Sequence, residues 1–335
     1  MKLRNSQIKV LVLAIVAVIP KSAKAIPVPI LDVPALVAGS DLVVTGKVTS
    51  IREDGTTVVN RVGDAVPARF AVCEVEVDKI LKGTIEGTTI LFRYVLPSEP
   101  IGYASVVLGY QILFLKKRNS EYSLTSPYYA SLPSVPGPAA VSGDALRQVT
   151  ALLGALLESP SVPAGQKQTA LHALSTIPTS ASTELLRKTL SEANTALRLG
   201  AAGFLLLRGD ISGMEIAERA LTHPEGLPPY AAHNLDYAIG EGVRNETAVP
   251  ALARLARLPE LETRQAAASA LRHTASKTAL KALVFLLVVR HEAIMGLAEI
   301  TGQSDWSPNL ELFRSQEERH VSHWRDWASA NLVTE

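Results

Sequence analysis

One sequence motif typical of a helix recurs along residues 164–302 at intervals of about thirty residues, and it limits the possible folds more than any other feature. In this motif a cation is followed three positions later by a small residue and four positions after that by a leucine. Copies begin at Lys167, Arg198, Arg264 and Arg290. Because the small residue and the leucine lie on one side of a helix, each copy predicts a helix with an apolar stripe.

A second apolar helix is expected between successive copies. The candidates span residues 183–190, 214–221, 249–258 and 280–288. Each unit is then a helix pair that cannot bury its apolar face alone, so the units must stack on one another. A looser copy at Tyr230 fills the gap in the series, and the copies are 31, 32, 34 and 26 residues apart. The short last interval predicts a trimmed final pair.

Residues 1–25 have the form of a signal peptide. Three cations flank or precede an apolar run over residues 10–19, and residues 23–25 read Ala-Lys-Ala, a small-x-small cleavage pattern. The run is shorter than the roughly 17 to 25 residues that span a bilayer. Export with cleavage is therefore favoured over an uncleaved N-terminal anchor. We expect an exported protein, periplasmic or extracellular, with no stable membrane span after processing.

Net charge and cysteine content indicate which partners are unlikely and where the single thiol lies. The segment 1–25 holds five of the 33 Lys and Arg residues and none of the 32 Asp and Glu residues, so the processed chain is mildly acidic. It has no basic block, which argues against nucleic acid as a partner. The single cysteine, Cys73, alternates with apolar Ala71 and Val75, so it is expected in a core.

Residues 26–126 predict a small β domain. Five runs with strand composition are bounded by Gly, Asp or Pro; they span residues 41–51, 69–80, 88–96, 106–116 and 121–125. Several short strands at this spacing are typical of a small antiparallel β barrel or sandwich. The expected fold class is thus a multidomain protein of α and β parts, with this domain first and the helical repeats after it.

The two parts are expected to be joined by a stiff linker over residues 127–143, because four prolines fall within residues 127–138. Asp144 then caps a helix that ends near Glu158. This helix would cover the first repeat of a helical region spanning residues 144–302, since a stack of repeats needs a cap at its open end.

Residues 303–335 are expected to form an aromatic helical cap at the other end. Trp306, Phe313, Trp324 and Trp327 follow the last helix pair and can cover its open face. An aromatic recognition patch is the alternative interpretation of the same residues.

The repeats resemble a known family. Residues 198–202, Arg-Leu-Gly-Ala-Ala, and residues 264–268, Arg-Gln-Ala-Ala-Ala, look like HEAT repeats. The stretch 290–302, followed by Trp-Arg-Asp-Trp at 324–327, is similar to the ends of secreted bacterial HEAT-repeat proteins. The chain departs from the family pattern at residues 230–237, where no cation precedes the small residues. The resemblance implies a curved α-solenoid.

The β domain has a resemblance of its own. Residues 75–83, 88–92 and 109–115 resemble the small OB-like or netrin-like domains carried by secreted bacterial proteins. Such a surface can bind oligosaccharide or peptide, but the chain has no dense patch of aromatic residues here. A spacer role is therefore favoured over a ligand site.

The solenoid resemblance implies a protein-binding surface, with the second helix of each unit lining the concave side. Its groove candidates are six cations: Arg187, Lys188, Arg219, Arg254, Arg257 and Lys281. Interleaved Glu184, Glu215 and Glu218 make this surface mixed in sign. An ordinary solvated face is the alternative interpretation.

A search for catalytic motifs finds no phosphate loop, nucleophile elbow, paired-cysteine motif or His-Glu-x-x-His sequence. The sequence therefore predicts no catalytic residue and no cofactor. His320 and His323 share a helix face and, with a carboxylate, are weak candidates for a metal site. Surface histidines beside the tryptophans are the favoured interpretation.

Two functions remain. The first is an exported, non-catalytic interaction scaffold that binds a protein partner through the solenoid surface. The second is an exported hydrolase, or a modulator of a hydrolase, whose site lies where the β domain meets the solenoid or at the C-terminal histidine pair.

Overall fold

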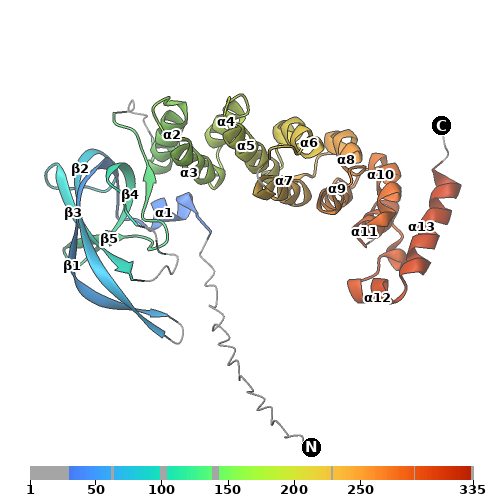
Figure 1. Ribbon diagram of the computed structural model, residues 1–335, viewed down its shortest axis with the longest axis horizontal. Helices are drawn as coiled ribbons and strands as arrows, with labels where there is room; N and C mark the ends of the chain where they lie inside the picture. Colours follow the sequence, from blue (N-terminus) through green and yellow to red (C-terminus); the bar gives the residue numbers. More distant parts are fainter. Residues whose placement is uncertain are drawn as a thin grey trace, which may run out of the picture.

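A six-stranded mixed sheet is followed along the chain by a curved row of twelve α-helices (Figure 1). The computed structural model describes residues 30–61, 64–98, 103, 105–137, 143–227, 229–289 and 291–332. An α/β multidomain chain is therefore confirmed at this coarse level. The expected signal peptide, residues 1–25, lies outside the described residues.

A short helix precedes the sheet. All five expected strands form, but the first extends to residue 61 instead of 51 and the second begins at residue 64 instead of 69. The elements are α1 (Val33–Gly39), β1 (Leu42–Arg61), β2 (Asp64–Lys82), β3 (Thr89–Pro97), β4 (Gly109–Arg118), β5 (Glu121–Leu124) and β6 (Ser131–Pro133). Neither α1 nor β6 was expected. The N-cap of α1 is Asp32, whose side chain accepts a hydrogen bond from the Ala35 amide at 2.8 Å.

The sheet closes on itself, since β1 pairs with both β2 and β4. The ring runs β1-β2-β3-β5-β4 and returns to β1. Five strands in a ring cannot alternate in direction throughout, so one neighbouring pair must be parallel. That pair is β3 and β5, with Phe92 opposite Tyr122. The prediction of a purely antiparallel sheet is therefore wrong, for this geometric reason.

Closure depends on a glycine in β1. Gly46 has one partner on β2, Val77, and another on β4, Gln111. A Cβ atom at Gly46 would lie 2.3 Å from the carbonyl oxygen of Glu76. Only glycine fits such a close approach of two strands. Inside the ring Cys73 is fully buried, as its alternation with apolar residues predicted.

The predicted linker over residues 127–143 is in part a strand. Within it β6 pairs with β4, and Leu132 is 2% exposed. Proline is compatible with this position because a strand at the edge of a sheet leaves backbone groups unpaired. Leu132 belongs to a core cluster that also contains Phe114 from the sheet and Leu153 from α2. The sheet and the first helices thus share one hydrophobic core instead of being held apart by a spacer.

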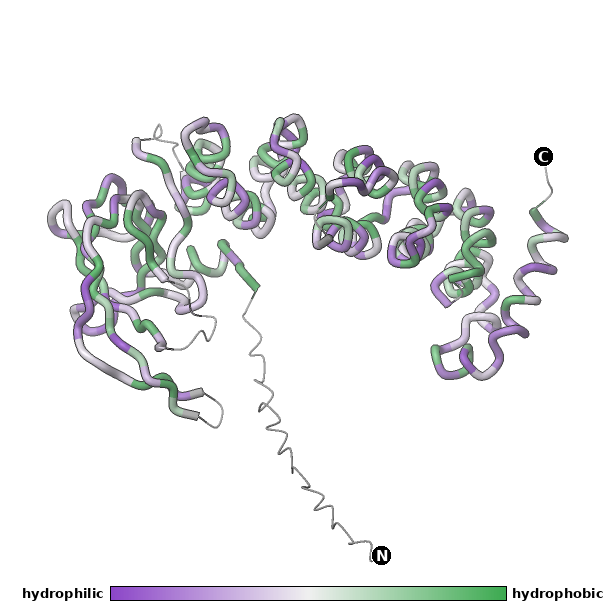
Figure 2. Tube along the Cα trace, viewed as in Figure 1, coloured by the Kyte–Doolittle hydropathy of each residue, from purple (hydrophilic) through white to green (hydrophobic). Residues whose placement is uncertain are grey.

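The remaining helices follow the predicted pairs. They are α2 (Ala145–Glu158), α3 (Ala164–Ser175), α4 (Ser180–Thr189), α5 (Thr195–Leu207), α6 (Met214–Thr222), α7 (Pro229–Gly242), α8 (Val249–Leu255), α9 (Leu261–His273), α10 (Leu280–Phe285), α11 (His291–Thr301), α12 (Leu310–Ser315) and α13 (Glu317–Asn331). Asp144 caps α2 as expected, with its side chain 2.8 Å from the Arg147 amide. Figure 2 shows hydrophobic stretches recurring along the whole row of helices.

A local structure repeats before three of the second helices. A 3-10 turn precedes each of α6, α8 and α10, and its capping side chain accepts a hydrogen bond from the amide two residues later. The capping residues are Asp210, Asn245 and Ser276. Short polar side chains favour such turns because they bond their own backbone. The units therefore repeat in detail as well as in helix order.

The last helices pack their aromatic side chains against the end of the row. Trp324 is fully buried and Phe313 is 5% exposed, and both belong to the core cluster that runs through the later helices. Trp306 and Trp327 are half-buried against the same cluster.

Candidate functional site

The row of helices has two sides formed by different helices. Figure 1 shows the row bending so that α3, α5, α7, α9 and α11 lie inside the curve and α4, α6, α8 and α10 outside it. We call these the inner face and the outer face. The expectation that the second helices line the concave side is therefore wrong. The inner helices approach closely through small residues, as at Gly242, where a Cβ atom would lie 1.9 Å from the Leu206 carbonyl oxygen.

Four of the six predicted groove cations form ion pairs on the outer face. The partners are Asp210 and Glu184 for Arg187, Glu158 for Lys188, Glu215 for Arg219, and Glu218 for Arg254. The Arg187 Nη2 to Asp210 Oδ2 and Arg219 Nη2 to Glu215 Oε1 distances are each 2.7 Å. These cations are already neutralised by carboxylates of the same chain.

The other two cations also lie on the outer helices or beside them. The guanidinium carbon of Arg257 lies 5.8 Å from the centre of the Phe285 ring, and Lys281 is exposed on α10. The structure does not bring the six cations into one hollow. Their role in binding stays a prediction.

The inner face has two hollows, on opposite sides of α7. The first, which we call the apolar pocket, has a volume of about 580 Å³ and lies among α3, α5 and α7. Leu171, Leu199, Phe204 and Tyr230 contribute its apolar lining, and none of the described residues around it is charged. It is suited to an apolar group.

The second hollow, which we call the acidic pocket, lies among α7, α9 and α11 and has a volume of about 610 Å³. Four carboxylates line it: Asp236, Glu241, Glu262 and Glu292. None of the described residues around it is Lys or Arg. The two pockets therefore differ in charge although they share the helix α7.

Asp236 is the most unusual of these carboxylates because it is buried. Its side chain is 7% exposed, and Oδ2 accepts a hydrogen bond from the Thr263 hydroxyl at 3.2 Å. Oδ1 has no hydrogen-bond partner within the described parts of the chain. A buried oxygen without a donor costs free energy. The chain thus keeps an acceptor here that its own folding does not use.

Burial raises the pKa of Asp236 to about 6, because the carboxylate loses hydration. The Thr263 hydrogen bond and nearby His233 lower this pKa, whereas Glu262 and Glu260 raise it. At neutral pH the group is still ionised in most molecules, and it is held in a negative environment. Such a group favours a cation brought next to it.

The other charged groups at the acidic pocket have partners of differing strength. The Nδ1 of His233 lies 3.4 Å from Glu262 Oε2, an attraction that requires a protonated imidazole. Arg272 pairs with Glu292 at 3.0 Å and with Glu299 at 2.7 Å. Glu292 is therefore neutralised by the chain itself, whereas Glu262 has no Lys or Arg partner among the described residues.

Two tyrosines mark the inner face on α7. Tyr230 is 62% exposed beside the apolar pocket, and Tyr237 is 60% exposed beside the acidic pocket. Residues seven apart lie on the same side of a helix. Aromatic rings held in the open at a concave surface are typical of recognition sites.

His320 and His323, the weak candidates for a metal site, differ in burial from what was expected. His320 is 3% exposed, so the expectation of a surface histidine is wrong for this residue. Burial first, then the charge of Arg319, lower the pKa of His320. His323 stacks on Trp306 with ring centres 3.6 Å apart, and its Nε2 lies 3.2 Å from Gln303 Oε1. The described residues contain no cluster of three or more His, Cys, Asp or Glu side chains that could hold a metal.

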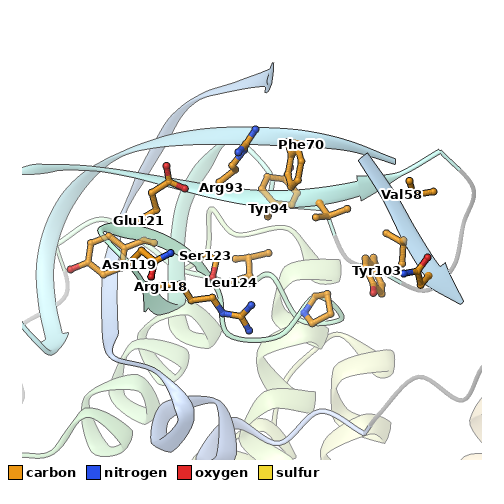
Figure 3. Close-up of a pocket in the computed structure, with 15 residues that line it drawn as sticks. Val58, Phe70, Arg93, Tyr94, Tyr103, Arg118, Asn119, Glu121, Ser123 and Leu124 are labelled. Atoms are coloured by element: carbon orange, nitrogen blue, oxygen red, sulfur yellow. The ribbon is translucent and has the colours of Figure 1, made fainter. Parts of the chain in front are cut away.

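A third hollow, of about 660 Å³, lies in the β domain (Figure 3). Figure 3 shows Phe70, Arg93 and Tyr94 on one side, with Glu121 towards one end and Tyr103 towards the other. The aromatic side chains that the sequence scatters are thus gathered here by the closure of the sheet. This hollow weakens the sequence-based argument for a plain spacer.

Arg93, one of two arginines that line this hollow, already has partners in the chain. Arg93 lies over the Phe70 ring at 3.9 Å and pairs with Asp54 at 3.0 Å. Its guanidinium donates to the Asp54 carbonyl oxygen as well, at 2.9 Å. Both polar contacts use Nη2 of Arg93, whereas its Nε has no hydrogen-bond partner within the described parts of the chain.

The junction between the sheet and the helices is packed with apolar side chains. Val33, Phe114 and Leu174 all lie in one core cluster there. The Val33 amide donates to the Thr176 hydroxyl across the junction at 3.2 Å. The junction therefore has the character of a hydrophobic core, and none of its described residues named here supplies an acid, a base or a nucleophile.

Comparisons with known proteins give little guidance. No family model matches the chain, and no curated protein matches it. Among solved structures, it is similar to a crystal structure of an engineered protein, a Northeast Structural Genomics Consortium target. The two are 21% identical over 47% of this chain and 83% of the other, with a TM-score of 0.36. A likeness this distant says nothing about what the chain binds.

One further observation concerns membranes. In the described parts of the chain, no helix combines the length and the apolar character needed to cross a bilayer.

Residue-by-residue reasoning missed the inner-face site because its members follow no known motif. The available signal was the departure from the repeat at residues 230–237, where tyrosine replaces the cation. Two tyrosines seven residues apart, with His233 and Asp236 between them, form a polar and aromatic stripe on a helix that should otherwise be plain.

Proposed function

We propose that this protein is an exported, non-catalytic interaction scaffold that binds a protein partner along the inner face of its helices. The observation that carries the proposal is the pair of hollows on either side of α7, each with an exposed tyrosine at its edge. A curved row with an open inner side buries a large area on an elongated partner. The outer face, where four of the six predicted cations are paired with the chain's own carboxylates, contributes less.

The proposal includes the family resemblance. The repeating 3-10 turns and helix pairs support a HEAT-like α-solenoid over residues 144–302, with an aromatic cap after it. The closed ring of strands supports an OB-like β domain. In this account the shared core makes the β domain a rigid end piece of the solenoid. The apolar run within residues 1–25 supports export.

The hydrolase alternative has less support. Its metal form needs a third ligand beside His320 and His323, and its junction form needs polar groups where the apolar side chains of one core cluster lie. The inner face has the features of recognition, so the scaffold is the function we favour.

Affinity capture with matched variants tests the proposal. The tagged full chain is used as bait in the envelope fraction of its host, beside the Tyr230→Ala/Tyr237→Ala and Arg187→Ala/Arg219→Ala double variants. We expect a specific protein to be retained by the wild type and by the outer-face variant, and to be lost with the inner-face variant. Equal retention by all three baits, or loss with the outer-face variant alone, would overturn the proposal.

A further inference from the structure

The two pockets of the inner face differ in a way that defines the chemistry of an occupant. The apolar pocket presents Leu171, Leu199 and Phe204. The acidic pocket presents Asp236 and Tyr237. Since α7 separates the two pockets, one occupant that fills both must cross this helix. It must place an apolar group in the first pocket and a cationic group in the second.

We propose that the inner face binds an extended peptide segment of the partner that carries an apolar side chain and, about three residues away, an arginine. The apolar side chain occupies the apolar pocket, and the guanidinium enters the acidic pocket beside Asp236 and Tyr237. This inference rests on the proposed function and specifies the partner's chemistry.

The spacing follows from helix packing. Neighbouring helices pack about 8–10 Å apart. The two pockets lie on either side of one helix, so across the row they are separated by roughly one such spacing. An extended chain advances about 3.3 Å per residue, so about three residues cover the distance.

Arginine is favoured by the groups that the acidic pocket offers. Asp236 Oδ1 is buried and has no hydrogen-bond donor among the described residues, although Oδ2 has one. A guanidinium supplies several donors in a fixed plane and loses less hydration than an ammonium group. The exposed ring of Tyr237 adds a face on which a guanidinium can stack.

The charge state of the pocket strengthens the argument and predicts a pH dependence. The charged groups near Asp236 are His233 on its own helix, Glu262 on α9 and Glu260, the N-cap residue of α9. His291 and Glu292, from α11, line the same pocket. Below pH 6 Asp236 gains a proton and loses its charge. This change removes the attraction for a cation, so arginine binding should weaken as the pH falls from 7 to 5.

Peptide titration tests the proposal. The probes are fluorescein-labelled peptides with capped ends and the sequences Gly-Leu-Ser-Ser-Arg-Gly, Gly-Leu-Ser-Ser-Glu-Gly and Gly-Ser-Ser-Ser-Arg-Gly. Their binding to the full chain is followed by fluorescence anisotropy at pH 7.5. We expect the first peptide to bind at least about tenfold more tightly than either of the other two, since each loses one side chain that fills a pocket.

Two variants assign the preference to the pockets. Asp236→Asn keeps the size of the side chain and should bring the Arg and Glu peptides within about threefold of each other. Gly200→Leu places a side chain in the apolar pocket, where a Cβ atom at Gly200 meets no atom closer than 4.0 Å. It should remove the advantage of the Leu peptide over the Ser peptide while keeping the preference for Arg. Arg219→Ala, on the outer face, is the matched control and should change neither preference.

The inference is overturned if the Arg and Glu peptides bind alike to the wild type, or if Asp236→Asn leaves the preference for Arg unchanged. These results are separable from a failure of the proposed function. If the peptides fail while the Tyr230→Ala/Tyr237→Ala bait still loses the captured protein, the inner face binds a partner of different chemistry. If that bait retains the captured protein as the wild type does, the scaffold proposal itself is overturned.

Discussion

The outer and inner faces of the helical row are built from the same units but differ in what they leave unpaired. On the outer face, Arg187, Arg219 and Arg254 each pair with a carboxylate of their own chain. On the inner face, two tyrosines are exposed and a buried carboxylate oxygen of Asp236 has no donor among the described residues. A face whose charges are already matched gains little from a partner, whereas a face with open aromatic and polar groups gains more.

The two faces are not expected to differ in stability as they do in charge pairing, because helices of both faces pack into the same hydrophobic clusters. The largest predicted effect comes from the end of one of these clusters. Trp324→Ala removes a fully buried side chain from the cap and should lower the free energy of unfolding by about 3–5 kcal/mol, damaging both faces together. Chemical denaturation followed by circular dichroism measures this change. An unchanged stability with lost binding would make Trp324 a recognition residue instead.

Arg208 should have the next largest effect, because it ties an inner helix to an outer one. Its guanidinium donates to the carbonyl oxygens of Leu174 and Ile177, at 2.5 Å and 2.7 Å, and to the Ser182 hydroxyl at 3.1 Å. Arg208→Ala leaves those half-buried acceptors unmatched and should cost about 2–4 kcal/mol. Arg208→Lys is the control: it keeps the charge but loses the fork, and should lose a smaller part of the stability. Equal stability of all three proteins would contradict this assignment.

Asp236→Asn is predicted to stabilise the protein, which separates binding from folding on the inner face. The folded-state pKa of about 6 lies above the ordinary value of 3.8, so the ionised group costs stability as the pH rises from 4 to 6. The variant should therefore gain on the order of 1–3 kcal/mol at pH 8 and little at pH 4. Urea denaturation at the two pH values measures both. The same change at pH 4 and pH 8 would show that Asp236 is not held in an unfavourable ionised state.

The smallest effect is expected on the outer face. Arg219 and Glu215 form an exposed pair one helical turn apart, so Arg219→Ala should change the free energy of unfolding by less than about 0.5 kcal/mol. Thermal unfolding in low and high salt measures this contribution. A loss above about 1 kcal/mol would mean that the outer pairs support the fold more than exposed ion pairs usually do.

Much of the fold could be predicted from the sequence because local patterns determine it. The repeated motif located the inner helices, and Asp144 marked the start of α2 through its capping bond. The parallel pair β3 and β5 could not be predicted in the same way, since it follows from closure of five strands. The strand β6 was not predicted because the prolines in and around it are typical of a linker.

The candidate site was less predictable than the fold. Which helices lie inside the curve depends on the close approach of backbones at residues such as Gly242, which no local pattern reports. The six cations were expected on the concave side by analogy with solenoids, whereas the helices that carry or adjoin them lie outside the curve. Asp236 on α7 is buried against Thr263 on α9, in the next unit. Its raised pKa therefore depends on how the units pack together, which no local pattern indicates.

The most direct test of the difference between the faces is photo-crosslinking of the full chain in its host. The photoreactive residue p-benzoylphenylalanine replaces Tyr237 on the inner face or, as the matched position, Arg219 on the outer face. Both side chains are exposed, so access of the reagent is comparable. The account predicts a discrete adduct with one partner protein from position 237 and none from position 219. An adduct from position 219 with none from position 237 would contradict it.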